Sequence, residues 1–382
     1  MDRRSFLRSS VVAGSTLLAA PLINRGRCRL SAAEQKEYSV RALDLVQRSL
    51  VIDMLGLLTM DWPKLERWQR IPGSFSEEDF QKLKQSGIDI FHPAVEPNAP
   101  EAYSATLQWT RDWNYFLENH AQYFLRIDGI EGMEAARSKG RIGILLGFQN
   151  SAHFRTIEDV GHFYRLGQRV SQLTYNSSNL IGHGCIERED TGLTDFGVEV
   201  VQAMNRFGMA IDVSHTGERT TLDAFSVSNK PVIITHSNCK ALVPKHPRCK
   251  SDEVIKRMAA DGSVMGITAI RNFIREQQPV TIHHLLDHFD HVVKLVGVEH
   301  VGLGTDMDAD VDPKTNKVRT QFDVRGLRPD RRVYDIAEGL IQRGYGDRDI
   351  ELMLGGNFRR VLGEIWDVEE PALTGPDHTE LS

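Results

Sequence analysis

Eight short apolar segments, separated by amphipathic stretches, constrain the fold of this chain more than any other feature of its sequence. The segments are rich in Val, Ile and Leu and show little polar alternation, which is typical of parallel strands buried on both faces. Eight such strands alternating with helices predict a (β/α)₈ TIM barrel, and a doubly wound open sheet is the alternative. The predicted strands are 50–54, 87–91, 141–146, 170–174, 209–213, 232–235, 263–267 and 300–304.

Amphipathic helices are predicted between these strands because apolar residues recur there at the helical period. The tail, 334–366, is also predicted to be helical and to pack on the outside of the barrel. No Pro- or Gly-rich linker divides the chain, so 34–382 is predicted to be one domain. The main predicted helices are 107–119, 156–166, 197–206, 252–260 and 282–295.

The first 33 residues have the layout of a twin-arginine export signal. Arg3 and Arg4 precede an apolar stretch of small residues, 11–20, that is too short to span a bilayer comfortably. Small residues at 31–33 suggest one cleavage point, and 19–20 offers another. The sequence therefore predicts that 1–33 is removed, that the mature chain is periplasmic or extracellular, and that it keeps no membrane span.

Charge and cysteine usage narrow the function classes further. The formal net charge of −6, without any cluster of Lys and Arg, argues against a nucleic-acid partner. No CxxC spacing exists, so a thiolate metal site is not expected. The mature chain would carry Cys185, Cys239 and Cys249 in an oxidising compartment, and the sequence leaves open whether Cys239 and Cys249 form a disulfide.

Polar residues that can carry chemistry stand at three of the predicted strand ends. His215 follows strand five, His236 follows strand six and Asp306 follows strand eight. The C-terminal ends of barrel strands meet at one face, where active sites lie. Neutral imidazoles suit divalent metals such as zinc, and a nearby carboxylate can bind metal or take a proton from bound water. These side chains leave two interpretations open, a metal site and a set of hydrogen-bonded core residues.

Several motifs in the same order resemble those of the membrane (renal) dipeptidase family. The segments IDVSH, PVIITHS and VGLGTD resemble the family patterns D-x-S-H, P-V-I-x-S-H-S and G-I-G-S-D-x-D. The resemblance extends over roughly residues 45 to 366. It implies a metal-dependent hydrolase on a TIM barrel, a dipeptide substrate and, often, a homodimer. The resembling blocks are 191–197, 205–215, 231–242, 301–306 and 355–358.

The resemblance implies roles for four residues of this chain. His215 and His236 match the family's histidine ligands of one zinc, and Asp306 matches the aspartate that contacts metal and handles the proton. Arg248 resembles the arginine that holds the substrate carboxylate, a role suited to a bidentate guanidinium. The alternative for Arg248 is a solvated charge on a loop.

The sequence departs from the family pattern at four positions. The two strand-one ligands of the other zinc fall on Leu55 and Leu57, which cannot bind metal. The bridging glutamate of strand three falls on Gln149, a neutral amide, and the strand-four histidine falls on Tyr175. A two-zinc site is therefore not expected, and we predict one divalent metal, zinc, per chain.

We weigh three interpretations of this altered site. In the first, a one-metal hydrolase, His215, His236 and the Gln149 carbonyl oxygen bind the ion. Asp306 is then the general base, and Tyr175 donates a hydrogen bond to the developing oxyanion. In the second, the barrel is catalytically degenerate and binds a small ligand without hydrolysing it. The third is different chemistry on the same barrel.

Two further histidines lie near predicted strand-end loops. His153 or His183 could supply an additional ligand to the one-metal site. The alternative is that both are ordinary loop histidines. The sequence alone does not choose between these interpretations.

Overall fold

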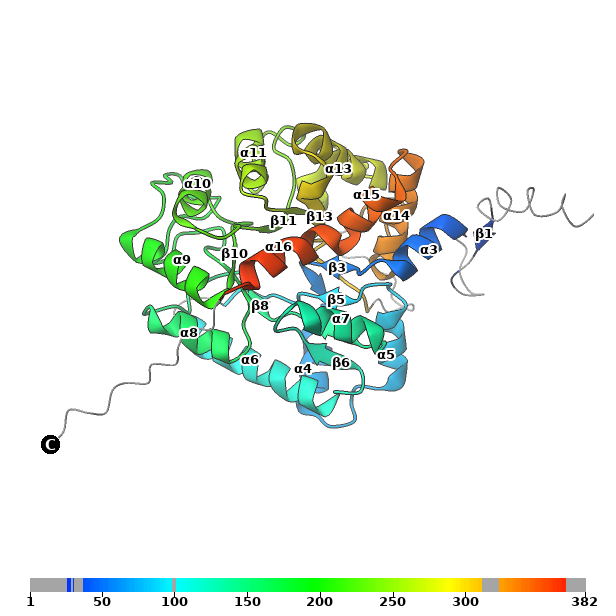
Figure 1. Ribbon diagram of the computed structural model, residues 1–382, viewed down its shortest axis with the longest axis horizontal. Helices are drawn as coiled ribbons and strands as arrows, with labels where there is room; N and C mark the ends of the chain where they lie inside the picture. Colours follow the sequence, from blue (N-terminus) through cyan, green and yellow to red (C-terminus); the bar gives the residue numbers. More distant parts are fainter. Residues whose placement is uncertain (1–25, 29, 31–36, 98–100, 311–322, 369–382) are drawn as a thin grey trace, which may run out of the picture.

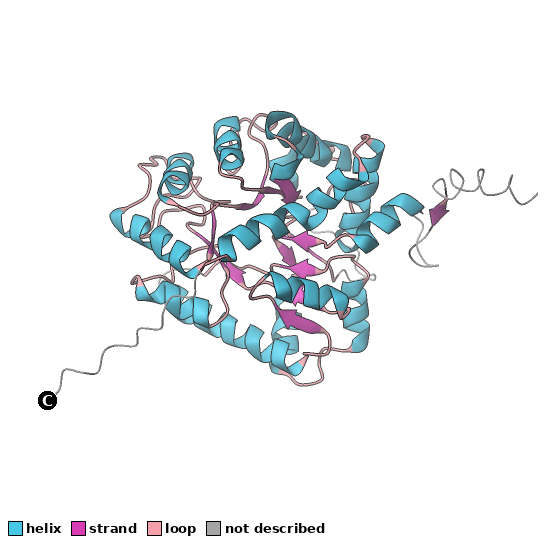
Figure 2. Cartoon of the chain, viewed as in Figure 1, coloured by secondary structure: helices cyan, strands magenta, loops and turns pink. Residues whose placement is uncertain are grey.

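The computed structural model describes residues 26–28, 30, 37–97, 101–310 and 323–368, and it confirms the predicted (β/α)₈ barrel (Figures 1 and 2). Strands β13 and β3 pair in parallel, and one parallel bridge between Asp212 and Ile233 joins β10 to the start of β11, so the ring closes. In ring order the strands are β3 (Ile52–Asp53), β5 (Ile90–Phe91), β7 (Ile142–Ile144) continued by β8 (Gly147–Phe148), β9 (Val170–Gln172), β10 (Ala210–Asp212), β11 (Ile234–Ser237), β12 (Met265–Ile267) and β13 (Val301–Leu303).

All eight predicted barrel strands are present, and each is shorter than predicted or shifted by a few residues. The third is broken at 145–146, so that β7 pairs with β5 while β8 pairs with β9. Five short strands were not predicted because none contains an apolar run long enough to be recognised. These are β6 (Phe124–Arg126) beside β7, β4 (Gly56–Leu57) paired with β14 (Met307–Asp308), and β1 (Arg27–Cys28), which pairs antiparallel with β2 (Tyr38–Ser39).

Helices surround the barrel, and the five main predicted helices are confirmed within a few residues at each end (Figure 2). Ser76, Thr194 and Ser251 each accept a hydrogen bond from a first-turn backbone N–H, which fixes the start of α5, α9 and α11. The helices are α3 (Val40–Arg48), α4 (Trp62–Arg70), α5 (Glu77–Lys84), α6 (Ala102–Asn119), α7 (Ile130–Ser138), α8 (Glu158–Arg165), α9 (Asp195–Phe207), α10 (Glu218–Val227), α11 (Asp252–Ala260), α12 (Arg271–Ile274), α13 (Ile282–Val296), α14 (Arg332–Gln342), α15 (Asp347–Glu351) and α16 (Asn357–Trp366).

The C-terminal helix α16 covers the end of the barrel where the strands begin (Figure 1). Phe358, Val361 and Leu362 belong to one buried cluster with strand residues such as Ile52 and Ile90. The predicted helical tail is therefore confirmed, and its position is more specific than the outer surface expected from sequence. With the strand starts covered, the C-terminal ends of the strands remain the accessible face of the barrel.

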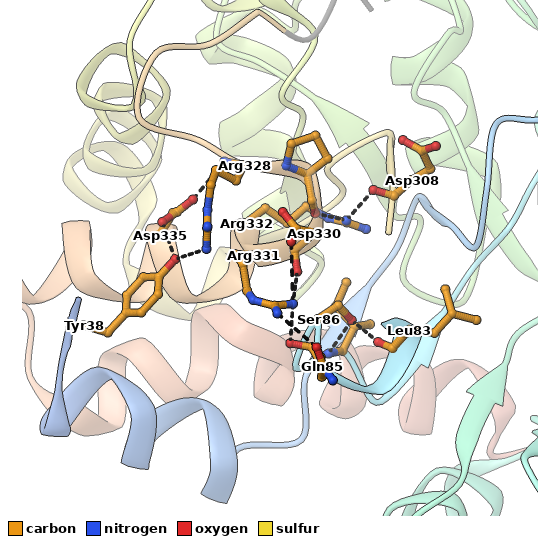
Figure 3. Close-up of polar contacts among 12 residues, drawn as sticks. Tyr38, Leu83, Gln85, Ser86, Asp308, Arg328, Asp330, Arg331, Arg332 and Asp335 are labelled. Atoms are coloured by element: carbon orange, nitrogen blue, oxygen red, sulfur yellow. Dashed lines mark hydrogen bonds and ion pairs between the residues drawn. The ribbon is translucent and has the colours of Figure 1, made fainter. Parts of the chain in front are cut away.

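A buried ion pair ties the start of α14 to the first barrel strand. Asp53 and Arg332 are both fully buried, and the Nη2 of Arg332 lies 3.0 Å from Oδ2 of Asp53. The Nη1 of Arg332 also donates to the carbonyl oxygen of Asp308 at 2.9 Å (Figure 3). Asp53 in turn accepts hydrogen bonds from the backbone N–H and the hydroxyl of Thr305, at 2.8 and 2.5 Å. One carboxylate thus joins β3, the end of β13 and α14.

The thiols of Cys239 and Cys249 are both free. The disulfide between them, which the sequence had left as an open question, is therefore absent. The Sγ of Cys239 donates to the carbonyl of His288 at 3.7 Å, and that of Cys249 donates to the carbonyl of Phe273 at 3.6 Å. Burial raises the pKa of Cys249 to about 12. Each thiol is therefore a protonated donor to its own backbone partner.

Most of the predicted export signal lies outside the described residues. Within the predicted signal, Arg27–Cys28 pairs with Tyr38–Ser39 of the predicted mature chain. The boundary after residue 33 stays a prediction. Among the helices in the described ranges, none combines the length and apolar character needed to cross a membrane.

Candidate active site

Two histidines meet at the open end of the barrel. His236 lies in β11 and His215 follows β10, and their Nε2 atoms are 3.0 Å apart. His236 is fully buried and His215 is 6% exposed. The pairing of neighbouring strand ends therefore brings together the two histidines that the sequence singled out.

The hydrogen bonds on the other ring nitrogens determine where the imidazole protons lie. The Nδ1 of His215 is 2.8 Å from Oδ1 of Asn176, an acceptor, so this nitrogen carries a proton. The Nδ1 of His236 is 2.8 Å from the hydroxyl of Thr235, and that hydroxyl donates its own proton to Asp212 at 2.6 Å. Thr235 can then only accept from His236. In the neutral rings both Nε2 atoms therefore present lone pairs, and they present them to each other.

Burial keeps both histidines neutral. It lowers the pKa of His215 and His236 well below the usual histidine value, and the positive charge of Arg248 lowers both further. A proton shared between the rings is thus disfavoured. Two facing lone pairs without a proton between them suit a metal cation, for which neutral imidazoles are common ligands.

Asp212 stands in the D-x-S-H motif, and the sequence analysis assigned it no role. Its carboxylate accepts from the backbone N–H and hydroxyl of Ser214, at 2.9 and 2.6 Å. It also accepts from the backbone N–H and hydroxyl of Thr235, at 2.9 and 2.6 Å. Asp212 thus holds in place the residues that adjoin both histidines, as carboxylates that hydrogen-bond around metal ligands commonly do.

Asp306 reaches the site through an unusual backbone conformation. Its φ is +58°, and the only other described non-glycine residue with positive φ is Asn176, the partner of His215. Such strain is costly away from glycine and concentrates at functional sites. The N–H of Asp306 donates to the carbonyl of Leu55 at 2.6 Å. Burial raises the pKa of Asp306 to about 7, while the nearby Arg248 opposes the increase.

Tyr175 covers one face of the histidine pair. Its ring stacks on His215 with centroids 4.0 Å apart and an interplanar angle of 21°. Burial, together with the negative charges of Asp306 and Glu96, raises the pKa of Tyr175 to about 12. The phenol is therefore protonated at neutral pH and can donate a hydrogen bond.

Arg248 lies behind the histidines, fully engaged at its terminal nitrogens. Nη2 donates to the carbonyl of His236 at 2.8 Å, and Nη1 donates to the carbonyl of Ser214 and to the hydroxyl of Ser237. Only Nε is without a partner. Arg248 is 2% exposed, so it is not a solvated loop charge. The binding of a substrate carboxylate by Arg248 stays a prediction.

The positions expected to hold a second metal carry no suitable ligands. Leu55 and Leu57 are buried apolar side chains, and the Nε2 of Gln149 donates to the carbonyl of Ala94 at 3.1 Å. Within the described ranges, no group of three or more His, Cys, Asp or Glu side chains is arranged to hold a metal ion. The Gln149 carbonyl oxygen as a ligand stays a prediction.

The two additional histidines are engaged in hydrogen bonds of their own. His153 is fully buried, and its Nε2 is 3.1 Å from Oε1 of Gln168. His183 contacts the hydroxyls of Ser178 and Thr191, at 2.9 and 3.0 Å. Both therefore match the alternative interpretation, in which they are ordinary loop histidines.

A cavity of about 840 Å³ opens from this site toward helices α4 and α6. Gln149, Tyr175 and Asp306 line its inner end together with Glu96, and side chains of α4 and α6 form its outer walls. We call it the α4–α6 pocket. Its size suits a small-molecule ligand. A second cavity of about 920 Å³ lies between α3, α5 and α7 and contains none of the predicted site residues.

Comparison with known proteins identifies the family. Residues 40–374 match the family described as membrane dipeptidase, peptidase family M19. The chain belongs to the membrane dipeptidase family. By this membership it is a dipeptidase-like hydrolase, and the resemblance inferred from its motifs is confirmed.

Individual relatives agree with the assignment. The chain is 32% identical to dipeptidase verJ of Clonostachys rogersoniana over 70% of this chain and 67% of that protein. It is 35% identical to an uncharacterized dipeptidase of Schizosaccharomyces pombe over 47% of this chain, and spans only 44% of that protein. A solved amidohydrolase from Pseudomonas aeruginosa has a TM-score of 0.73 at 28% identity, covering 85% of this chain and 99% of the other. This chain therefore shares its barrel fold with that amidohydrolase.

Proposed function

We propose that this membrane dipeptidase family member hydrolyses the amide bond of a dipeptide, or of a similar small amide with a carboxylate, using one divalent metal. The observation that carries the proposal is the pair of unprotonated Nε2 atoms of His215 and His236, 3.0 Å apart. The buried leucines at positions 55 and 57 argue for one metal rather than two. A bound zinc ion would polarise the substrate carbonyl and lower the pKa of a water molecule.

The residues of the chain supply the proton transfers and the orientation. Asp306, whose pKa is raised to about 7 by burial, accepts a proton from the attacking water and returns it to the leaving amine. Tyr175 donates its phenolic hydrogen to the carbonyl oxygen as negative charge develops. Gln149 is proposed as a further oxygen ligand of the ion. Arg248 attracts the substrate carboxylate through its positive charge.

Metal content tests the proposal. We expect purified mature protein to hold about one zinc ion per chain by elemental analysis, and His215→Ala and His236→Ala each to lose it, because each removes one of two imidazole ligands. His183→Ala is the matched control, since His183 is hydrogen-bonded to Ser178 and Thr191 instead, and it should retain the metal. The loaded protein should hydrolyse dipeptides.

Other outcomes would favour the remaining interpretations. No metal, even after reconstitution with zinc, would contradict the one-metal hydrolase and favour a degenerate barrel that only binds a small ligand. Two ions per chain would contradict the proposed stoichiometry. Stoichiometric metal without amide hydrolysis would point to different chemistry on the same barrel.

The phenol of Tyr175 should matter for rate more than for binding. We expect Tyr175→Phe to lower kcat by about 10²- to 10³-fold, the usual cost of losing one oxyanion donor, while metal content stays unchanged. Steady-state kinetics with a dipeptide would measure the effect. A KM increase at constant kcat would instead mean that Tyr175 only shapes the pocket.

Export and assembly complete the proposal. The twin-arginine pattern at Arg3 and Arg4 supports delivery to the periplasm or the exterior, with no membrane span kept after processing. A homodimer is proposed from the family resemblance alone.

A further inference from the structure

A carboxylate with no partner in the described part of the chain, Glu96, lines the inner end of the α4–α6 pocket. Glu96 lies in the loop that follows β5, beside Gln149, whose backbone N–H donates to the carbonyl of Val95 at 2.8 Å. Glu96 is half-buried and makes no ion pair or hydrogen bond with another residue of the described ranges. Its charge acts on Tyr175, so it lies close to the reacting centre.

Two of the other acidic side chains that line the pocket are paired with a cation. Arg70, the only basic residue lining the pocket among those described, pairs with Asp112 at 2.7 Å and with Glu66 on α4. Asp306 is the general base proposed above. Glu96 is therefore the carboxylate with neither a cationic neighbour nor an assigned task, and burial raises its pKa. A ligand cation would supply the missing partner.

The charges at the barrel mouth are arranged with opposite signs on opposite sides. Glu96 follows β5, the second strand of the ring, while Arg248 and Lys250 follow β11, the sixth. In a ring of eight strands, the second and sixth lie across the mouth from each other. His236 lies in β11 on the strand-six side, while His215, Tyr175 and Asp306 follow β10, β9 and β13, which lie between the two sides, where the amide would lie.

We propose that Glu96 binds the protonated amino group of the substrate and thereby selects free dipeptides over N-acylated amino acids. This inference rests on the proposed function. A zwitterionic dipeptide would lie across the mouth, its ammonium at Glu96 on the strand-two side and its carboxylate toward Arg248 on the strand-six side. Acylation removes the positive charge and leaves the half-buried carboxylate unpaired, which costs binding free energy.

Binding measurements test the selection without relying on turnover. The probes are a phosphinate mimic of Ala-Ala with a free amine and its N-acetyl derivative, titrated calorimetrically into zinc-loaded protein at about pH 7, where an α-amino group is mostly protonated. We expect the free amine to bind roughly 10- to 100-fold more tightly in the native protein, as for a charge-assisted contact. In Glu96→Gln this ratio should fall toward one.

Glu66→Gln is the matched control, because Glu66 lines the same pocket but is paired with Arg70, and it should preserve the ratio. Metal content and thermal unfolding of Glu96→Gln establish that the variant is folded and loaded. Equal binding of the two probes by the native protein, or an unchanged ratio in Glu96→Gln, would overturn the inference while leaving the proposed function standing. Failure of both probes to bind the native protein would overturn both.

Discussion

Replacing Asp53 by alanine should lower the free energy of unfolding by about 3–5 kcal/mol, the usual cost of breaking a buried ion pair from one side. Both Asp53 and Arg332 are fully buried, so the guanidinium would be left without its carboxylate in a place that water does not reach. The same change removes two hydrogen bonds to Thr305. Because single domains are stable by only about 5–15 kcal/mol, this is a large fraction of the total.

Chemical denaturation of the native protein and the variant measures the loss. Glu78→Ala is the control, since Glu78 pairs with Lys82 on the exposed face of α5 and such pairs contribute little. A double variant, Asp53→Leu with Arg332→Met, should recover part of the stability because no buried charge remains unpaired. A loss below about 1 kcal/mol in Asp53→Ala would mean that the pair behaves like a surface ion pair.

Asp306→Asn should reduce kcat/KM for a dipeptide by about 10²- to 10⁴-fold, because the amide cannot accept a proton from water. Asparagine is the appropriate replacement since it has nearly the same shape and tolerates the left-handed backbone conformation at this position, where φ is +58°. The fold should therefore be preserved, and the loss should reflect the proton transfer.

The comparison is made by steady-state kinetics on zinc-loaded protein. Asp310→Asn serves as the control, because Asp310 is on the same loop but pairs with Lys64 at 2.7 Å, and its activity should be near native. If Asp306→Asn kept more than a tenth of the native kcat/KM, Asp306 would not be the general base.

The barrel could be predicted from sequence because its signal is local. Each buried strand is a short apolar run, as at 209–213, and the end of each run marks where the open face lies. His215, His236 and Asp306 were found for this reason alone. Strands such as Phe124–Arg126 were missed because their burial depends on neighbours rather than on their own composition.

The sequence by itself determined the fold, the family, the two histidines at neighbouring strand ends and the loss of the family's metal ligands at positions 55 and 57. Tertiary structure alone decided the protonation pattern of the histidines, because Asn176 and Asp212 act across strands. It also decided that Cys239 and Cys249 stay apart. It placed Glu96 beside the reacting centre without a partner among the described residues. These properties depend on distances and directions between side chains far apart in the chain, which packing sets and no local pattern records.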